Sequence, residues 1–205
     1  WQSFEQTGGE WNPVPPVRSP QLGDDAVLNL LQDENFIHTG SQLFNTQWLG
    51  KVGGFDERHW LIEDVDLNVR LSMSGGRFLH AAAGRPLFLY RRRGASLSRR
   101  RRLDFLTGCI RNLKLAETWW RERGMVTPAR TEFLLASYES LLHGLAPVDN
   151  DAFEELLGHV LSLSPEWQPS QSAMHWLSRC VGYPAAERLA IRYRQLKGRL
   201  RPAAI

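Results

Sequence analysis

Cysteine is scarce in this sequence, and several kinds of functional motif are missing from it. Its 205 residues include two cysteines, Cys109 and Cys180, each within an apolar helical pattern. This excludes a disulfide scaffold, and we expect both to be reduced core residues of a cytosolic protein. No apolar run reaches membrane-spanning length, and we expect no signal peptide. The six histidines show no metal-ligand spacing, and there is no CxxC, HExxH or phosphate-binding glycine loop.

The composition is that of a globular protein. Hydrophobic residues make up 42% and charged residues 23% of the chain, which argues against global disorder. The net charge is only +3, but seven arginines fall between Arg91 and Arg102. Such a patch suits phosphates, anionic lipid or an acidic partner. We do not expect nucleic-acid binding, because the patch lacks interleaved aromatic residues and a groove-reading motif.

The chain is expected to contain two regions. Residues 1–23 are rich in glycine and proline, which predicts an extended loop. Further along, a strand is predicted at Asn35–Ser41, a helix from Asp64, and two short strands within residues 77–92. Strand, helix and strand in this order predict an α/β layer over residues 1–98. The remaining residues, 99–205, are predicted to be all α-helical.

Several signals mark the predicted helices of the second region. A long helix ends at Gly124, and Thr127 followed by Pro128 is a typical helix start. Two further helices are predicted at residues 171–181 and 185–199. The clearest apolar stripe in the chain consists of Phe153, Leu156, Leu157, Val160 and Leu161.

Four motifs stand in order in the first region: HTGSQLF from His38, VGGFDE from Val52, IEDVDLNVRL from Ile62 and LYRRRGASLS from Leu89. Together, over roughly residues 25–98, they resemble the acceptor-side, C-terminal half of the catalytic domain of family 2 glycosyltransferases. The resemblance implies a partial GT-A fold, the nucleotide-sugar-binding α/β layer of those enzymes. It also implies a hexosyltransferase-type activity in polysaccharide or glycolipid biosynthesis.

Sugar transfer needs a base to remove the proton of the attacking hydroxyl and positive charge to meet the departing diphosphate. The resemblance makes Asp64 this general base, usually with inversion at the anomeric carbon. Glu63 points about 100° away from Asp64 on a helix, so it would support the acceptor instead. The alternative is that both carboxylates only cap a helix, because acidic residues favour helix starts.

The resemblance also implies substrate contacts by seven further residues: Thr39, Gly40, Ser41, Trp60, Arg91, Arg92 and Arg93. The Thr39–Ser41 turn would lie beside the donor sugar or the acceptor, or it is only a tight turn. Trp60 could stack on a sugar ring, or it belongs to the core or its rim. Arg93 stands where many relatives have a histidine that binds the metal, and an arginine there could meet the diphosphate directly.

The expected cofactor is a divalent metal, Mg²⁺ or Mn²⁺, whose ligands should lie mainly in an upstream half, because the sequence lacks a DxD metal motif at a strand end. No metal ligand is assigned within this sequence.

The expected partners are a nucleotide-sugar donor and a saccharide or lipid-linked acceptor. Residues Arg99–Arg102 face solvent or rest on an anionic membrane. The chain is expected to be a partial sequence, without transfer activity alone, from the cytoplasm or the inner face of the membrane. The alternative is a non-catalytic helical scaffolding module that retains a degenerate transferase remnant.

Overall fold

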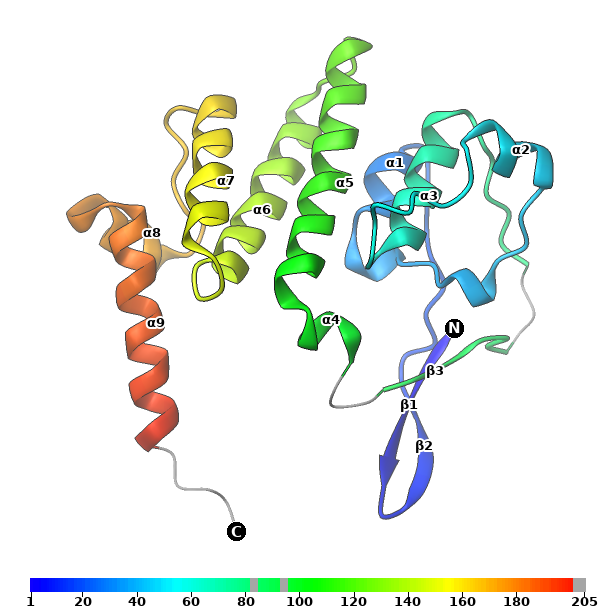
Figure 1. Cartoon of the computed structure of the whole chain (residues 1–205), viewed down its shortest axis with the longest axis horizontal. Coiled ribbons are helices and arrows are strands. Elements are labelled where there is room, and N and C mark those ends of the chain that lie inside the picture. Colours follow the sequence, from blue (N-terminus) through cyan, green and yellow to red (C-terminus); the bar gives the residue numbers. More distant parts are fainter. Residues whose placement is uncertain (82–84, 93–95, 201–205) are drawn as a thin grey trace. The chain divides into compact units, whose positions relative to one another are not determined.

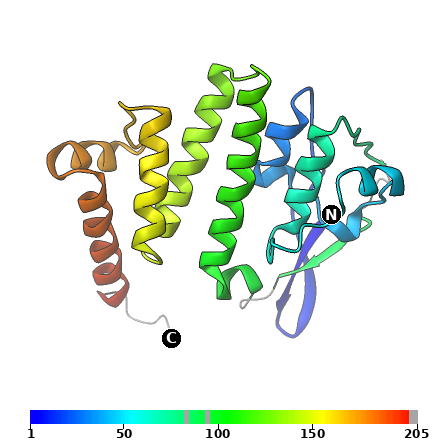
Figure 2. The ribbon, with the colours of Figure 1, turned by 45° about the horizontal axis from the view of Figure 1, so that its top comes forward.

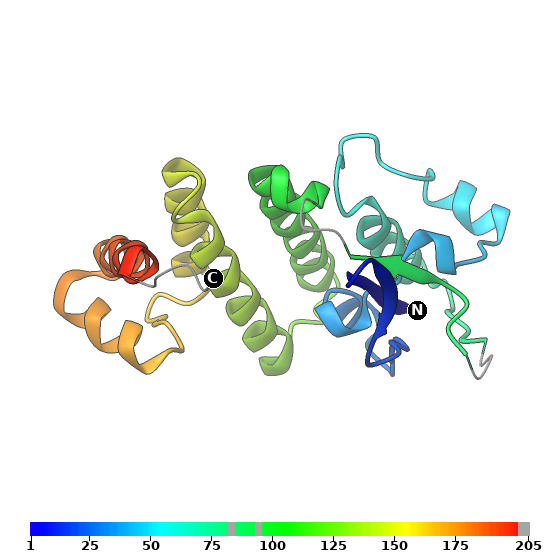
Figure 3. The same cartoon turned by 90° about the horizontal axis from the view of Figure 1, so that it is seen from below.

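The computed structural model describes residues 1–81, 85–92 and 96–200, and over these residues the chain is mainly helical (Figure 1). The described strands are β1 (Gln2–Thr7), β2 (Glu10–Val14) and β3 (Leu89–Arg91). They form a sheet of order β2-β1-β3, in which β1 pairs antiparallel with β2 and parallel with β3. Figure 3 shows β3 running beside β1.

The contacts divide the chain into two compact units, Trp1–Val126 and Thr127–Ile205. The predicted division at residue 98 was based on expected secondary structure, and the division by contacts falls later. The helices of the first unit are α1 (Ala26–Leu30), α2 (Thr46–Lys51), α3 (Glu63–Met73), α4 (Leu97–Arg100) and α5 (Arg102–Glu122), with 3₁₀ turns η1 (Asp33–Asn35) and η2 (Thr39–Ser41). Those of the second unit are α6 (Pro128–Leu145), α7 (Asn150–Leu163), α8 (Ser172–Val181) and α9 (Tyr183–Leu200).

The prediction of a GT-A α/β layer followed by a separate helical region is wrong. A strand was predicted at residues 35–41, but residue 35 is the end of η1 and residues 39–41 form η2. Residues 77–81, where the next strand was predicted, form no strand. The second strand predicted within residues 77–92 is reduced to the three residues of β3. A short apolar run forms a strand only where another strand offers its backbone groups, and pairing of this kind is not encoded locally.

The sheet instead begins in the segment predicted to be a loop. Gly8 and Gly9 have φ values of 63° and 89°, and this left-handed backbone closes the β1–β2 hairpin. Pro13 lies in β2, which pairs with β1 at the edge of the sheet, where a missing N–H is tolerated. The prolines therefore excluded a helix, as expected, without excluding a strand.

Helices α1 and α3 lie side by side in the first unit (Figure 2). The Asp25 side chain caps α1 by accepting a hydrogen bond from the Leu28 N–H at 3.1 Å. Apolar side chains of α1, α3 and α5 are buried in this unit: Val27, Leu30, Leu67, Val69, Leu71 and Leu106. Burial of one such side chain stabilises the fold by about 1.5–3 kcal/mol. This packing fixes the position of α3, whose first turn carries Asp64.

The second unit confirms several predicted helix signals. Thr127 caps α6 by accepting from the Arg130 N–H, and Pro128 occupies the first turn. The predicted stripe on α7 is buried apart from Leu161, which is 40% exposed. Both cysteines are free, but the prediction that both are core residues is wrong for Cys180, which is exposed on α8.

Candidate active site at the start of helix α3

Helix α3 begins from a strained backbone turn. The residue before it, Ile62, has φ 57° and ψ 29° and provides no side-chain cap. A β-branched residue in the left-handed region costs roughly 1–3 kcal/mol, and such conformations are typical of functional sites. Gly108 of α5 allows the close approach, because a Cβ atom there would lie 3.1 Å from Cγ1 of Ile62 and 3.3 Å from the Leu61 carbonyl oxygen.

Asp64 is a half-buried carboxylate in the first turn of α3. Its Oδ1 accepts a hydrogen bond from the Val65 N–H at 2.9 Å. Burial, followed by the negative charge of Glu63, raises the pKa of Asp64 to about 6. A helix start ordinarily favours an ionised carboxylate, so desolvation outweighs the helix dipole here. Asp64 is therefore mostly ionised at pH 7 and is a stronger base than a surface aspartate.

A buried ion pair holds the loop that precedes α3 onto this helix. We call this loop, residues 52–58, the glycine loop. Asp66 is 2% exposed and accepts from Nε and Nη2 of Arg70 at 2.8 Å and 2.5 Å. The same guanidinium donates to the Val52 carbonyl at 2.6 Å and the Gly54 carbonyl at 2.8 Å. Arg70 thus bridges helix and loop with hydrogen bonds to charged and carbonyl oxygens. We call Asp66 and Arg70 the α3 clamp.

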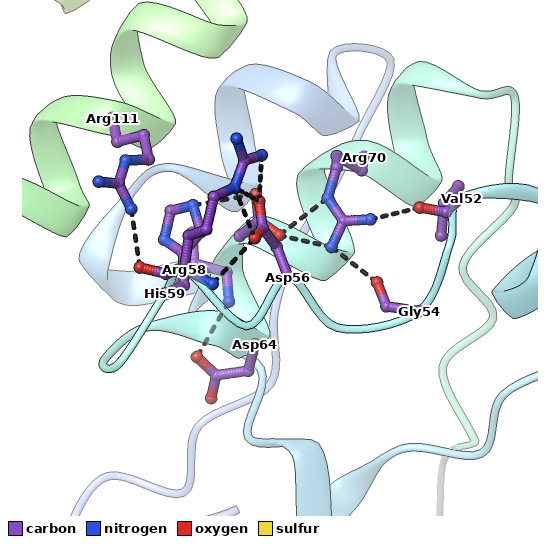
Figure 4. Close-up of polar contacts among 10 residues, drawn as sticks. Val52, Gly54, Asp56, Arg58, His59, Asp64, Arg70 and Arg111 are labelled. Atoms are coloured by element: carbon purple, nitrogen blue, oxygen red, sulfur yellow. Dashed lines mark hydrogen bonds and ion pairs between the residues drawn. The ribbon is translucent and has the colours of Figure 1, made fainter.

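The rest of this loop is held by further polar contacts, and Asp64 points away from them (Figure 4). Asp56 accepts from the backbone N–H and side chain of Arg58, and these hydrogen bonds hold the pKa of Asp56 well below its usual range. Arg111 of α5 donates to the Arg58 carbonyl at 2.9 Å. His59 is buried with Nε2 3.5 Å from Oδ1 of Asp66, and burial lowers its pKa. His59 is therefore neutral at pH 7.

Trp60 projects from the loop just before Asp64. It is 70% exposed, which contradicts a place in the core but fits a rim residue as well as a sugar-stacking face, so sugar stacking stays a prediction. The Arg101 guanidinium lies 4.5 Å from the centre of the Trp60 ring, within cation–π range. Arg101 also pairs with Asp104 at 2.5 Å. These contacts hold the indole next to the basic start of α5 while leaving most of it accessible.

The Thr39–Ser41 turn is η2, and its atoms are used within the fold. Gly40 is needed for packing, because a Cβ atom there would lie 2.6 Å from the Phe88 ring. The Ser41 hydroxyl donates to the His38 carbonyl at 2.7 Å. Among the described residues, no hydrogen bond joins this turn to Asp64. Its predicted place beside the substrate stays a prediction.

The His38 side chain lies inside an aromatic cluster beside η2. Ring centres of Trp1, Phe36, Phe88 and Tyr90 lie 4.6, 4.5, 5.0 and 4.7 Å from that of His38. Burial lowers the pKa of His38 to about 4, so the imidazole is neutral at pH 7. The cluster explains how β3 and η2 are joined, and His38 acts there as a packing residue.

The arginines predicted to meet a diphosphate lie on and after β3. The Arg91 guanidinium is 4.7 Å from the Trp11 ring centre. Arg92 donates to Glu5 Oε1 at 2.9 Å across the sheet. Arg93 lies outside the described residues. The two described arginines are exposed but already engaged with the β1–β2 hairpin, so phosphate contact stays a prediction for them.

Sequence reasoning missed the residues that build this site around Asp64. Asp66 and Arg70 were interpreted only as part of the motif, and Gly108 was not noticed. Asp66 and Arg70 are four residues apart on one helix, and this spacing in the sequence could have predicted their ion pair. The close approach that requires Gly108 has no local signal, because its partner is 46 or 47 residues away in the sequence.

A second polar cluster lies within the other unit. The His143 Nδ1 contacts Oε1 of buried Glu187, and its Nε2 is 3.7 Å from Oε1 of Glu139. Glu187 also accepts from the Tyr183 hydroxyl at 3.0 Å and lies 3.6 Å from Arg194. The hydrogen bond to Glu187 raises the pKa of His143. A shallow cleft beside it is lined by Ala136, Glu139, Ser140, His143, Ser170 and Gln171.

Within the part of the chain that the structure describes, no three His, Cys, Asp or Glu side chains are grouped closely enough to hold a metal ion. The described helices also include none with the length and apolar content needed to cross a membrane. Comparisons with protein-family models, with curated proteins and with solved structures found no match to this chain.

Proposed function

We propose that this chain supplies the acceptor side of a glycosyltransferase, in which Asp64 is the general base. The observation that carries the proposal is the state of this carboxylate: it is half-buried on a strained helix start, and its pKa is raised to about 6. Perturbed carboxylates of this kind are typical of catalytic acids and bases. The four sequence motifs that begin at His38, Val52, Ile62 and Leu89 indicate the reaction class, which is sugar transfer. The proposal does not use a GT-A layer, which the described residues do not form.

In the proposed step, Asp64 takes the proton of the acceptor hydroxyl as its oxygen attacks the anomeric carbon of the donor. The bond from that carbon to the diphosphate oxygen breaks, and the nucleoside diphosphate leaves with the electron pair. Attack opposite the leaving group inverts the anomeric centre. Burial raises the basicity of Asp64, and the negative charge of Glu63 raises it further.

The surrounding residues would position the reactants. The α3 clamp holds the glycine loop against the helix that carries Asp64. Trp60 offers an exposed aromatic face four residues before the base, which suits the apolar face of a sugar ring. A divalent metal, Mg²⁺ or Mn²⁺, would be bound mainly by groups other than the described residues, and Arg91 or Arg92 would meet the diphosphate of the donor. The Arg99–Arg102 segment would meet a lipid-linked acceptor at an anionic membrane surface.

The test is transfer by the natural full-length protein, assayed with a panel of nucleotide-sugar donors and saccharide or lipid-linked acceptors. Asp64→Asn should lower kcat roughly 10²–10⁴-fold, the usual contribution of a general base. The matched control is Asp24→Asn, an exposed aspartate next to another helix start, which should leave kcat unchanged. Glu63→Gln should retain activity and move the lower pKa of the kcat/KM profile below 6, because it removes a negative neighbour.

Retention of transfer by Asp64→Asn in the folded protein would refute the assignment of the base. Absence of transfer with every donor, together with a wild-type Asp64 that titrates near 4, would favour the scaffolding alternative instead. The pKa of Asp64, followed by carboxyl-carbon NMR in the wild type and in Glu63→Gln, distinguishes a missing substrate from a wrong site.

A further inference from the structure

Helix α9 is packed through only part of its length. Tyr183, Ala186 and Glu187 near its start are buried within the second unit. From Arg192 to Lys197, every side chain is exposed. The side chains of this part of the helix are therefore largely uncovered, although Arg194 reaches back to Glu187 at 3.6 Å.

The uncovered part of α9 carries an apolar stripe. Leu189, Tyr193 and Leu196 are 45%, 64% and 59% exposed. Their spacing of four and three residues places them on one face of the helix. Single exposed apolar side chains need no explanation, but three aligned on one helix face indicate an interaction surface. We call these three residues the α9 stripe.

The charges beside the stripe are all of one sign. Residues 188–197 contain four basic and no acidic side chains. At 100° per residue, Arg188 and Arg192 lie on one side of the stripe and Lys197 lies on the other. An apolar stripe flanked by cations is typical of helices that lie in the interface of an anionic membrane. Tyr193 suits that depth, because its ring is apolar and its hydroxyl stays wet.

We infer that the α9 stripe docks on an anionic lipid bilayer, with Leu189, Tyr193 and Leu196 inserted and the flanking cations at the headgroups. A second copy of this chain fits the surface less well, because it would bring the same cations together. The inference is independent of Asp64, which belongs to the other compact unit. It also concerns a surface different from Arg99–Arg102.

The experiment is co-sedimentation of the full chain with vesicles of phosphatidylcholine alone or with roughly one third phosphatidylglycerol. We expect binding to the anionic vesicles, little binding to the neutral ones, and weaker binding as salt is raised from about 0.05 to 0.5 M. Vesicles without any sugar acceptor are used, so the result does not depend on transferase activity. An Asp64→Asn variant should bind as the wild type does.

Two variants test the two parts of the surface. A stripe variant combines Leu189→Ser, Tyr193→Ser and Leu196→Ser, and a charge variant combines Arg188→Gln, Arg192→Gln and Lys197→Gln. The stripe variant should bind at least tenfold more weakly. The charge variant should lose roughly fivefold for each cation removed. Circular dichroism should show an unchanged helix content in both, because all six side chains are exposed.

Matched controls separate the α9 stripe from other surfaces. Leu161→Ser removes an exposed apolar side chain from α7, and Arg179→Gln removes an exposed cation from α8. Binding lost in the arginine control but kept in the two α9 variants would overturn the inference. So would equal binding to neutral vesicles, no binding to anionic ones, or an α9-dependent dimer in sedimentation that ignores lipid.

Discussion

Replacing Asp64 by asparagine should stabilise the first unit while it removes the proposed base. Asparagine has nearly the same shape as aspartate. In the wild type the Val65 N–H donates a hydrogen bond of 2.9 Å to Oδ1 of Asp64, and the Oδ1 of asparagine can accept the same hydrogen bond. What changes is the charge. Burial and Glu63 make the ionised carboxylate unfavourable in the folded protein, as its raised pKa shows. An uncharged side chain avoids that penalty.

The magnitude follows from the two pKa values of Asp64. The pKa rises from the ordinary 3.8 to about 6 on folding, and each pKa unit corresponds to about 1.4 kcal/mol. The folded state therefore holds this proton more tightly than the unfolded state does. Its contribution to stability is fully present below pH 4 and is lost as the pH rises through 6. At pH 7 the loss is about 3 kcal/mol at most, and roughly 1–3 kcal/mol for a half-buried group.

The assay is urea unfolding followed by tryptophan fluorescence, which reports mainly on the first unit because six of the eight tryptophans lie there. The free energy of unfolding of Asp64→Asn should match that of the wild type near pH 4 and exceed it by roughly 1–3 kcal/mol at pH 7. Asp24→Asn serves as the control and should show no such difference. A variant that is destabilised, or a difference that does not change between pH 4 and 7, would refute the reasoning about desolvation.

Three further outcomes are expected. Asp66→Ala leaves the Arg70 guanidinium partly buried without its carboxylate, so it should cost about 3–5 kcal/mol of stability and speed amide exchange in residues 52–58; unchanged exchange there would argue against the α3 clamp. Gly108→Ala should destabilise the first unit despite the higher helix propensity of alanine, because its methyl group meets the strained loop at 3.1 Å; a gain of about 1 kcal/mol would show that α5 moves freely. The hydrogen bond to Glu187 raises the pKa of His143, so the contribution of protonated His143 to the stability of the second unit should be fully present just below pH 6.5 and be lost as the pH rises through the folded pKa. His143→Gln should remove this dependence in a thermal unfolding series, and an identical pH profile in the variant would contradict it.

Many helices and their ends could be predicted from the sequence alone, because these signals act over a few residues. Asp25 and Thr127 each bond a backbone N–H three residues ahead, and both caps are present. The α7 stripe is buried as its period indicates, apart from Leu161. The position of Glu63 and Asp64 in the first turn of a helix could also be predicted, because acidic residues favour helix starts.

Tertiary structure decided the sheet and the chemical state of the site. The β1–β3 pairing joins Gln2 to Leu89, and no local pattern announces such a distant partner. The raised pKa of Asp64 depends on its burial, and the strained Ile62 lies against Gly108 of α5. Sequence determined which side chains stand at the start of α3, because helix signals are local. Whether that carboxylate is desolvated could be decided only by packing, because burial depends on residues far away in the chain.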